Sequence, residues 1–446
     1  MGQMRYIIIG AGGVGGTIGG CLFQGGHEVV LVARGPHLDA LRARGLRLAT
    51  PFGTSELEIP AVGGPGEVSL RSDDVLIIAT KTQDVEGVLA DWAWQPVAGE
   101  TVAADALPVV CAQNGVASER FALRCFRRVY AMYVWLPATH LEPGTVQAQG
   151  TPLAGVLGVG RYPSGTDAAI ELISADLAAS RLLAPVAADV MRWKYGKLLD
   201  NLNNAIEALC GRAATGFAGE PAAADAGELY RRTRGEGVAA LAAAGIAFAA
   251  PDELAAVRGA SVRIERIDGA ARTGGSSWQS LTRGTGTIEA DFLNGEVVLL
   301  GREHGVPTPV NAGLQRLANL AARERRTPGF MTPGQVLAAA GHLRDIPRRT
   351  ASARPREVLM EALDGNAIGG QLFEVFGREM TAVSGTCGHC GSVSRIAELR
   401  VYASGPGTVG RCPSCGEVVL VLTSIRGELR ATVRQFAMPD QPNAGG

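Results

Sequence analysis

The hydrophobic pattern of the chain changes in kind near residue 186. Before this point, short apolar runs rich in β-branched residues are bounded by glycine or polar residues, which is typical of buried parallel strands. These runs include RYIII, HEVVLV, DDVLII and LPVVC. Beyond residue 186, helical patterns dominate, most clearly over residues 192–211, 221–249, 287–305 and 311–326. The pattern predicts an α/β domain over residues 1–185 and an all-helical domain over residues 186–339.

One predicted helix, RWKYGKLLDNLNNAIEALCG at residues 192–211, carries polar groups among its leucines. At about 100° per residue, Lys194, Lys197, Asn201 and Asn204 fall within an arc of roughly 80° and form one stripe. The packing face lies elsewhere on the helix and consists of Tyr195, Leu198, Leu202, Ile206 and Leu209. The stripe faces water, as charged helix faces usually do, or it faces a partner or a pocket.

Length and composition exclude several classes of protein. A chain of 446 residues is long enough for two or three domains, and its net charge of −1 provides no overall field to attract nucleic acid or an anionic membrane. The longest apolar runs are shorter than the roughly 18 residues that span a bilayer, and no signal peptide pattern opens the chain. We therefore expect a soluble, cytoplasmic protein without a membrane partner. Four cysteines lie in scattered apolar contexts typical of buried free thiols: Cys21, Cys111, Cys125 and Cys210.

A glycine-rich loop follows the first predicted strand. Gly10, Gly12 and Gly15 have the G-x-G-x-x-G spacing, between a strand and a helix, and a second strand follows at the βαβ distance. Glycines in this context let backbone N–H groups approach a pyrophosphate at the helix N-terminus. The pattern predicts a dinucleotide site formed by Gly10, Ala11, Gly12, Gly13, Val14 and Gly15.

Arg34 ends the second strand, where an NAD-preferring site would usually have Asp or Glu on the ribose 2′-hydroxyl. A guanidinium suits a 2′-phosphate, so the sequence favours NADP(H). The alternative is that Arg34 merely caps the next helix in solvent.

Two further strands end in polar residues. Lys81 follows DDVLIIAT, and Asn114 with Gly115 follows LPVVCAQ. Side chains after the carboxyl ends of parallel strands lie where open α/β sheets bind ligands. Both residues are candidates for the cofactor region, although an ordinary loop lysine and an Asn-Gly turn are equally compatible with the sequence.

Taken in order, these motifs resemble the ketopantoate reductase family (2-dehydropantoate 2-reductases) over about residues 4–330. The resemblance rests on GAGGVG, the TK of Lys81, the NG of Asn114, KLLDN, and the stretch SSWQSLTRGTGTIEADFLNGEVVLLGREHGVPTPVN. It implies a Rossmann-like domain followed by a helical domain like the C-terminal domain of 6-phosphogluconate dehydrogenase, with the active site between them. It also implies NADPH-dependent reduction of a small branched 2-oxo acid, with 2-dehydropantoate as the substrate in pantothenate biosynthesis.

The resemblance assigns roles to the polar stripe. Lys197 matches the family's catalytic lysine, and Asn201 matches the asparagine one turn later. Ser277 matches a substrate-binding serine, and Glu289 matches the residue that holds the hydrogen-bond network of the catalytic site. Asn114 would contact the substrate or the nicotinamide. Independently of the family, hydride transfer to a ketone builds negative charge on oxygen, and a lysine can both stabilise and protonate that oxygen.

Three positions depart from the family pattern. Its second helix asparagine would fall at Ala205, whereas this chain has Asn204, one residue earlier. The run after the serines reads SSWQSL, and an upstream asparagine appears as Gly274. These changes concern the substrate pocket more than the chemistry. If the helix register differs, Lys194 rather than Lys197 is the catalytic lysine.

The last four cysteines are paired. Cys387 and Cys390 form one C-x₂-C, Cys412 and Cys415 form another, and 21 residues separate the pairs. This spacing is typical of a zinc ribbon, in which four thiolates bind a structural Zn²⁺. A disulfide pair or a redox dithiol is less suited to a cytosolic enzyme, and His389 could replace one cysteine.

The segment around these cysteines resembles short bacterial zinc-ribbon proteins of unassigned function. We expect a linker over residues 340–357, a zinc ribbon over 358–436 and a disordered tail over 437–446. Basic residues are too scattered to favour nucleic acid, so a packing or assembly role fits better. The sequence leaves open a homodimer, a reductase of a larger acid or an imine, and an NADPH-sensing regulatory protein whose ribbon contacts another macromolecule.

Overall fold

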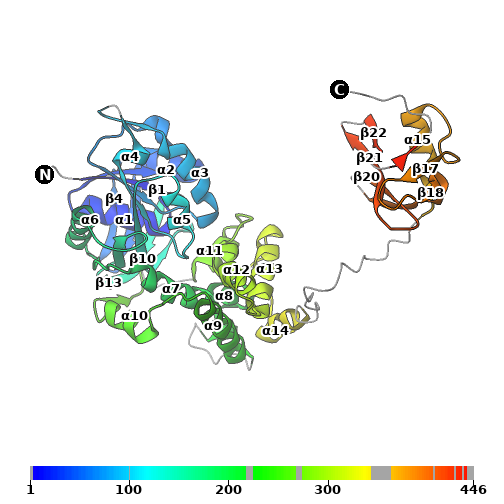
Figure 1. Ribbon diagram of the computed structural model, residues 1–446. Coiled ribbons are helices and arrows are strands. Elements are labelled where there is room, and N and C mark those ends of the chain that lie inside the picture. Colours follow the sequence, from blue (N-terminus) through cyan, green and yellow to red (C-terminus); the bar gives the residue numbers. More distant parts are fainter. Residues whose placement is uncertain are drawn as a thin grey trace. The chain divides into compact units, whose positions relative to one another are not determined.

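The computed structural model describes residues 4–99, 101–216, 225–267, 274–342, 363–404, 407–425, 428–433 and 436–438. The chain forms two compact units, Met1–Pro347 and Arg348–Gly446 (Figure 1).

The first unit opens with an eight-stranded sheet in the order β15-β14-β10-β9-β6-β1-β2-β5. Its strands are β1 (Arg5–Ile9), β2 (Glu28–Val32), β5 (Ala61–Val62), β6 (Asp74–Ile78), β9 (Pro108–Cys111), β10 (Arg128–Trp135), β14 (Gly155–Arg161) and β15 (Leu182–Leu183). Neighbours from β10 to β5 are parallel, whereas β10 and β14 are antiparallel. The chain leaves β1 toward β2 and later returns to β6 on the other side of β1. Such a change of direction opens a ligand-binding crevice at the carboxyl ends of the strands.

Helices cover both faces of this sheet, as its continuous apolar runs predict. Tyr6 and Ile8 of β1 face one cluster together with α1 (Gly13–Gln24) and α6 (Ala168–Ala179). Ile7 and Ile9 face the opposite cluster with α3 (Val85–Ala93), α4 (Ala103–Ala106) and α5 (Ser118–Leu123), the arrangement visible in Figure 1. Alternate residues of a strand point to opposite faces, so β1 is buried on both sides.

A smaller sheet, β11-β12-β3-β4, packs on the outer side of α1. Its strands are β3 (Leu46–Thr50), β4 (Gly53–Leu57), β11 (Ala138–Thr139) and β12 (Thr145–Ala148). The other short elements before residue 186 are α2 (Gly35–Arg44), η1 (Pro65–Glu67), η2 (Thr82–Asp84), β7 (Pro96–Val97), β8 (Thr101–Val102) and β13 (Gly150–Pro152). The α1 helix is therefore enclosed between two sheets.

Helices dominate the rest of the first unit. They are α7 (Val190–Asn201), α8 (Asn203–Thr215), α9 (Ala226–Ala243), α10 (Pro251–Arg258), α11 (Ser276–Thr282), η3 (Glu289–Phe292), α12 (Asn294–Glu303), α13 (Pro309–Arg323) and α14 (Pro333–His342). One short strand, β16 (Val262–Ile264), pairs antiparallel with β13 and joins the helical part to the strand-rich part. The α/β fold with a helical second part is thus as the sequence predicts. The α14 helix ends three residues inside the predicted linker, and residues 343–357 of that linker lie outside the described residues.

The segment predicted as one helix over residues 192–211 is two helices. The α7 helix ends at Asn201 and α8 begins at Asn203, with Leu202 in the turn between them. Leu198 and Leu202 are fully buried in one core cluster, whereas Ile206 and Leu209 are fully buried in the next. The predicted apolar face is confirmed, and the break falls where it passes from one cluster to the other.

The described residues of the second unit form a small β structure with the α-helix α15. A three-stranded sheet holds β17 (Ser384–Cys387), β18 (Val393–Arg395) and β23 (Phe436–Ala437), and a four-stranded sheet holds β19 (Arg400–Ser404), β20 (Gly407–Arg411), β21 (Val418–Ile425) and β22 (Glu428–Thr432). The helical turns are η4 (Gly365–Ile368), α15 (Gly369–Phe376) and η5 (Ile396–Glu398). Leu372 of α15 and Phe436 of β23 are buried in its core. Of the predicted tail, Ala437 lies in β23, and residues 439–446 lie outside the described residues.

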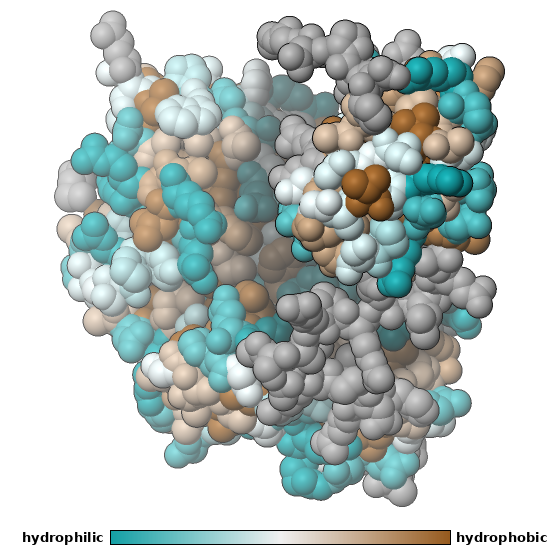
Figure 2. Space-filling view, turned by 45° about the vertical axis from the view of Figure 1, so that its right-hand side comes forward, coloured by the Kyte–Doolittle hydropathy of each residue, from teal (hydrophilic) through white to brown (hydrophobic). Residues whose placement is uncertain are grey.

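The described helices and the visible surface show no extended apolar segment. None of the described helices is long and apolar enough to cross a membrane. On the face shown in Figure 2, exposed apolar residues are scattered among hydrophilic ones.

Candidate active site and metal centre

Three of the predicted site residues follow the carboxyl ends of adjacent parallel strands. Gly10 follows β1, Lys81 follows β6 by three residues, and Asn114 follows β9 by three residues. Because β6 pairs with both β1 and β9, these ends meet at one edge of the sheet. This edge is also where the strand order changes direction, so a ligand crevice is expected here.

The glycine loop has the close backbone packing that its spacing predicts. Gly10 has φ 102°, and a side chain there would lie 2.7 Å from the backbone nitrogen of Thr80. A Cβ on Gly15 would lie 2.1 Å from the carbonyl oxygen of Gly10. Gly12 is the N-cap of α1, so Gly13 and Val14 belong to its first turn, and Ala11 is buried beside them. The backbone N–H groups of this turn have no intrahelical acceptors and suit a phosphate.

Arg34 lies just beyond the end of β2 with its side chain in solvent. Its backbone occupies the N-cap position of α2, but its side chain makes no capping hydrogen bond. The side chain is 83% exposed, and Nη2 donates to Asp84 Oδ2 at 3.0 Å. A guanidinium held this loosely can turn to a 2′-phosphate at small cost, because exposed ion pairs contribute little.

Lys81 and Glu289 form the centre of a hydrogen-bonded group. Lys81 Nζ donates to Glu289 Oε2 at 2.6 Å. The other carboxylate oxygen, Oε1, accepts from Thr82 N at 3.0 Å and from Thr82 Oγ1 at 3.1 Å. Glu289 begins η3 and is buried, so this group joins the helical part to the end of β6. Thr82, a residue that the sequence analysis did not identify, is the buried link between Lys81 and Glu289.

Asn114 and Asn201 meet across the same junction. Asn201 Nδ2 donates to Asn114 Oδ1 at 2.9 Å, and Thr82 Oγ1 is 3.4 Å from the Asn114 carbonyl oxygen. Lys197 lies one helical turn before Asn201 on α7 and is half-buried. Residues four apart on a helix share one face, so Lys197 is on the side of α7 that faces the strand ends.

Lys194 belongs to the interior instead. Its side chain is 2% exposed, and Nζ donates to Glu119 Oε1 at 2.5 Å and to the Gln113 carbonyl oxygen at 3.0 Å. Glu119 is fully buried in the first turn of α5. The ammonium is thus paired with a carboxylate and held against the residue before Asn114, away from a crevice. Because Lys194 is buried in the interior and Lys197 is only half-buried, this geometry favours Lys197 over Lys194 as the lysine that reaches a substrate.

All three lysines of the chain lie at this junction. Lys81, Lys194 and Lys197 are the only lysines among 42 basic residues, the others being arginines. Arginine serves equally well at most exposed positions, whereas lysine is a compact ammonium that can give up its proton. An ammonium is therefore used only in this part of the protein.

The serine motif packs along α8. Ser277 of α11 is 3% exposed, while Asn204 Nδ2 lies 3.5 Å from Ser276 Oγ. Ala205 is buried in the core cluster of the helical part. The asparagine one residue earlier therefore faces the serine helix, and Ala205 could not.

Gly274 and Gly275 precede this helix. A side chain on Gly274 would lie 2.6 Å from the ring of Trp278, so the indole occupies that space. Glu207 Oε2 accepts from Gly275 N at 3.0 Å. The two departures from the family motif, at positions 274 and 278, are therefore packed against each other.

Two histidines beside the glycine loop, His37 and His140, could not be predicted from the sequence, because neither lies in a recognisable motif. His37 Nδ1 accepts from Gly144 N at 2.9 Å, so its Nε2 carries the proton and donates to the Ala11 carbonyl oxygen at 2.8 Å. The His37 and His140 rings lie 4.3 Å apart. Burial lowers the pKa of His37 and lowers that of His140 to about 4, so both rings are neutral near pH 7.

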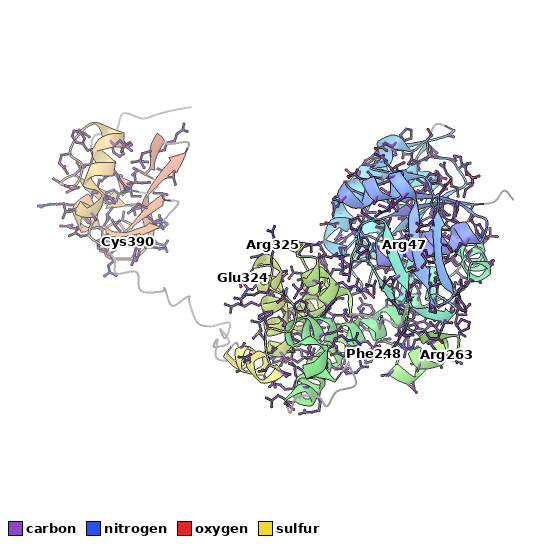
Figure 3. The ribbon with its side chains drawn as sticks, turned by 180° about the vertical axis from the view of Figure 1, so that it is seen from behind. Arg47, Phe248, Arg263, Glu324, Arg325 and Cys390 are labelled. Atoms are coloured by element: carbon purple, nitrogen blue, oxygen red, sulfur yellow. The ribbon has the colours of Figure 1, made fainter. Side chains whose placement is uncertain are left out.

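The four paired cysteines converge in the second unit. All four sulfur atoms lie within 4.8 Å of one another. Two of the separations, Cys387 to Cys415 and Cys390 to Cys412, are 3.8 Å. Four sulfurs at about 2.3 Å from a tetrahedral Zn²⁺ are about 3.8 Å apart, so the cluster fits this ion, whereas a disulfide needs about 2.05 Å. Cys390 lies at the surface of the unit in Figure 3.

Ser392 lies beside two sulfur atoms of this cluster. Its hydroxyl lies 3.1 Å from Cys390 Sγ and 3.4 Å from Cys412 Sγ. The hydrogen bond from Ser392 lowers the pKa of Cys390. Thiolates rather than thiols are the ligands that bind zinc.

Comparison with known families agrees with this geometry. Residues 6–162 match the model "Ketopantoate reductase PanE/ApbA", and residues 189–322 match "Ketopantoate reductase PanE/ApbA C terminal". The chain belongs to the ketopantoate reductase family of NADP-dependent oxidoreductases. Residues 359–442, which contain the four cysteines, match a family of unknown function (DUF6510).

Relatives of this ketopantoate reductase family member cover its first unit. It is 26% identical over 329 residues to a 2-dehydropantoate 2-reductase of Halobacterium salinarum, covering 72% of this chain and 100% of the relative. The crystal structure of a PanE/ApbA family ketopantoate reductase from Ralstonia eutropha JMP134 is 26% identical, with a TM-score of 0.59, and covers 72% of this chain and 99% of that one. A D-mandelate dehydrogenase solved with NADH and anilino(oxo)acetate is 22% identical, with a TM-score of 0.60 and coverage of 72% and 99%. This last likeness shows the common fold.

Proposed function

We propose that this protein uses NADPH to reduce the ketone of a small branched 2-oxo acid, and that the substrate is 2-dehydropantoate and the product (R)-pantoate. The observation that carries the proposal is the meeting of Lys81, Asn114, Asn201 and Glu289 at the carboxyl edge of the sheet, one helical turn from Lys197. The 2-dehydropantoate 2-reductases among its relatives support the substrate.

Lys197 is the proposed acid. When bound, NADPH supplies the hydride that adds to the carbonyl carbon, and the oxygen that gains negative charge needs a cation and then a proton. The Lys197 ammonium provides both, and water then restores its proton. An arginine could stabilise the charge but could not give up a proton near neutral pH, which agrees with the use of lysine only at this junction.

The surrounding groups orient the reactants. Asn201 and Asn114 hold each other, which fixes the orientation of their remaining amide donors and acceptors. Asn204 of α8 lies beside Ser276 of α11, the neighbour of Ser277, and we assign substrate binding to Asn114, Asn201 and Ser277. Glu289 holds Lys81 and Thr82 in place and belongs to the catalytic group. Fixed dipoles of this kind lower the cost of reorganisation during reaction.

The cofactor residues follow from the glycine loop and the strand ends. Residues 10–15 hold the pyrophosphate at the N-terminus of α1, Lys81 and Asn114 lie toward the nicotinamide, and Arg34 holds the 2′-phosphate. The exposed Arg34 side chain supports NADPH rather than NADH.

We further propose that Cys387, Cys390, Cys412 and Cys415 bind one structural Zn²⁺ in the second unit. Four protein ligands leave no coordination position for a substrate, so the ion stabilises this unit and takes no part in catalysis. A cytoplasmic location, a homodimer and an assembly role for the ribbon remain predictions.

Purified protein should oxidise NADPH when 2-dehydropantoate is added, and Lys197→Ala should abolish the turnover. A panel of other 2-oxo acids and imines tests the substrate, because activity only with another compound would contradict 2-dehydropantoate while keeping the chemistry. NADPH binding without turnover on any compound would contradict the reductase assignment and favour an NADPH sensor.

The small number of lysines offers a second test. Reductive methylation followed by peptide mass spectrometry can report each ε-amine separately. We expect Lys194 to stay unmodified because it is buried, and Lys197 to be modified in the free protein and protected when NADPH and product are bound. Equal modification of Lys197 with and without ligands would contradict its place in the site.

A further inference from the structure

Arg283 brings a positive charge into the junction between the helical and strand-rich parts of the first unit. It is the C-cap residue of α11, and its Nη1 donates to the His140 carbonyl oxygen at 2.9 Å. Its Nε is buried and has no hydrogen-bond partner among the described residues. Burial also lowers the pKa of Arg283, which reflects the cost of keeping the charge there.

The neighbours of Arg283 do not neutralise it. The two rings near it, His37 and His140, are neutral near pH 7. Among the described residues, Glu289 is the carboxylate that acts electrostatically on Arg283, and both oxygens of Glu289 already accept hydrogen bonds from Lys81 and Thr82. A guanidinium has five donors in a fixed fork, and a largely buried one is costly unless an anion pairs with it. Within the described residues, the single negative charge of Glu289 is thus shared between Lys81 and Arg283, which leaves the guanidinium without an anion of its own.

The residue that Arg283 contacts, His140, lies beside the glycine loop. His140, whose carbonyl oxygen it binds, has a ring carbon 3.9 Å from where a Cβ on Gly12 would lie. Gly12 caps α1, whose first N–H groups suit a phosphate. Gln279 fixes this arrangement, because its Oε1 accepts from His140 N at 3.3 Å and its Nε2 donates to the Ala138 carbonyl oxygen at 3.2 Å. These hydrogen bonds of Gln279 hold α11 beside the glycine loop.

We propose that Arg283 binds the pyrophosphate of the dinucleotide from the side opposite the glycine loop. The helix α1 and the helical part of the unit would then hold the cofactor between them, with Nε and the second Nη of Arg283 donating to phosphate oxygens. An Arg-phosphate pair of this kind is frequently bidentate and charge-assisted. This inference rests on the proposed function only in requiring a bound dinucleotide.

Direct binding of NADPH to the full chain, followed by its fluorescence, tests the inference without turnover. Arg283→Met should weaken binding about 10- to 100-fold, as expected for the loss of a hydrogen bond to a charged group. The same loss should appear with 2′-phospho-ADP-ribose, which keeps the pyrophosphate and lacks the nicotinamide. Arg283→Lys should weaken binding less, because it keeps the charge and loses the fork. Arg302→Met is the matched control, since Arg302 is exposed on α12.

Unchanged affinity of Arg283→Met for both probes would overturn the inference. Unchanged affinity with a raised KM for the 2-oxo acid would also overturn it, because the arginine would then bind the substrate carboxylate. If Arg283→Met does not fold, the Arg283→Lys variant decides by the same two probes. Wild-type protein that fails to bind NADPH would instead contradict the proposed function.

Discussion

The buried pair of Lys194 and Glu119 gives the sharpest test of the catalytic register. Both side chains are at most 2% exposed, and Lys194 Nζ lies 2.5 Å from Glu119 Oε1. Lys194→Met keeps the length and apolar stem of the side chain but leaves the Glu119 carboxylate buried without its cation. Removing one partner of a buried ion pair typically costs about 3–5 kcal/mol in the free energy of unfolding.

This cost is large against a typical total of about 5–15 kcal/mol. We therefore expect a clear fall in the denaturant midpoint of Lys194→Met, measured by circular dichroism in urea with the slope of the transition unchanged. The double variant Lys194→Met with Glu119→Met should recover most of the loss, because replacing a whole buried pair by apolar residues is often neutral. Lys197→Ala is the matched control and should change the unfolding free energy by about 1 kcal/mol or less.

The two lysines should also differ in activity. Lys197→Ala should lose turnover while remaining folded, whereas Lys194→Met should lose stability and only part of its turnover through the shifted Gln113 carbonyl. A Lys194→Met protein of wild-type stability that has lost all turnover would refute this reasoning and make Lys194 the catalytic lysine.

Other predictions address the acid, the cofactor, the metal and the histidine. Lys197→Ala should reduce kcat about 10²- to 10⁴-fold with NADPH affinity retained, and Lys197→Arg should not rescue it, because a guanidinium does not release its proton; rescue by arginine would show that charge alone suffices. Arg34→Glu should weaken NADPH binding at least 10-fold and leave NADH binding within a few-fold, and equal effects on both cofactors would contradict a 2′-phosphate contact. Elemental analysis should find one zinc per chain. Cys412→Ser should lose both the zinc and the folded second unit, while NADPH oxidation persists. A metal-free protein whose second unit still resists proteolysis would contradict a structural ion. The pKa of His140 is lowered to about 4 from an ordinary value of about 6.5, so the unfolded chain binds this proton first as the pH falls. The stability that the neutral ring contributes is therefore lost as the pH falls from about 6.5 to about 4. His140→Gln should flatten the dependence of the unfolding free energy on pH in that window, and an unchanged slope would contradict a buried neutral ring.

The sequence by itself determined the class of the fold, the glycine loop and the pairing of the last four cysteines. The β-branched apolar run Tyr6–Ile9, bounded by glycine, is typical of a strand buried on two faces, and Gly10 and Gly15 lie where contacts are too close for a side chain. The spacing of the four cysteines likewise predicts their cluster, because each C-x₂-C turn brings two sulfurs together. These features depend on residues near one another in the chain.

Tertiary structure decided which polar residues meet. Lys194 and Lys197 lie on the same predicted stripe, and only the position of Glu119, 75 residues earlier, makes one of them part of the interior. The role of Thr82 depends on Glu289, 207 residues later, and the position of the Arg283 guanidinium depends on the carbonyl oxygen of His140, 143 residues earlier. Such pairs arise from the packing of α7, α11 and η3 against the sheet edge, and no local period or spacing encodes that packing.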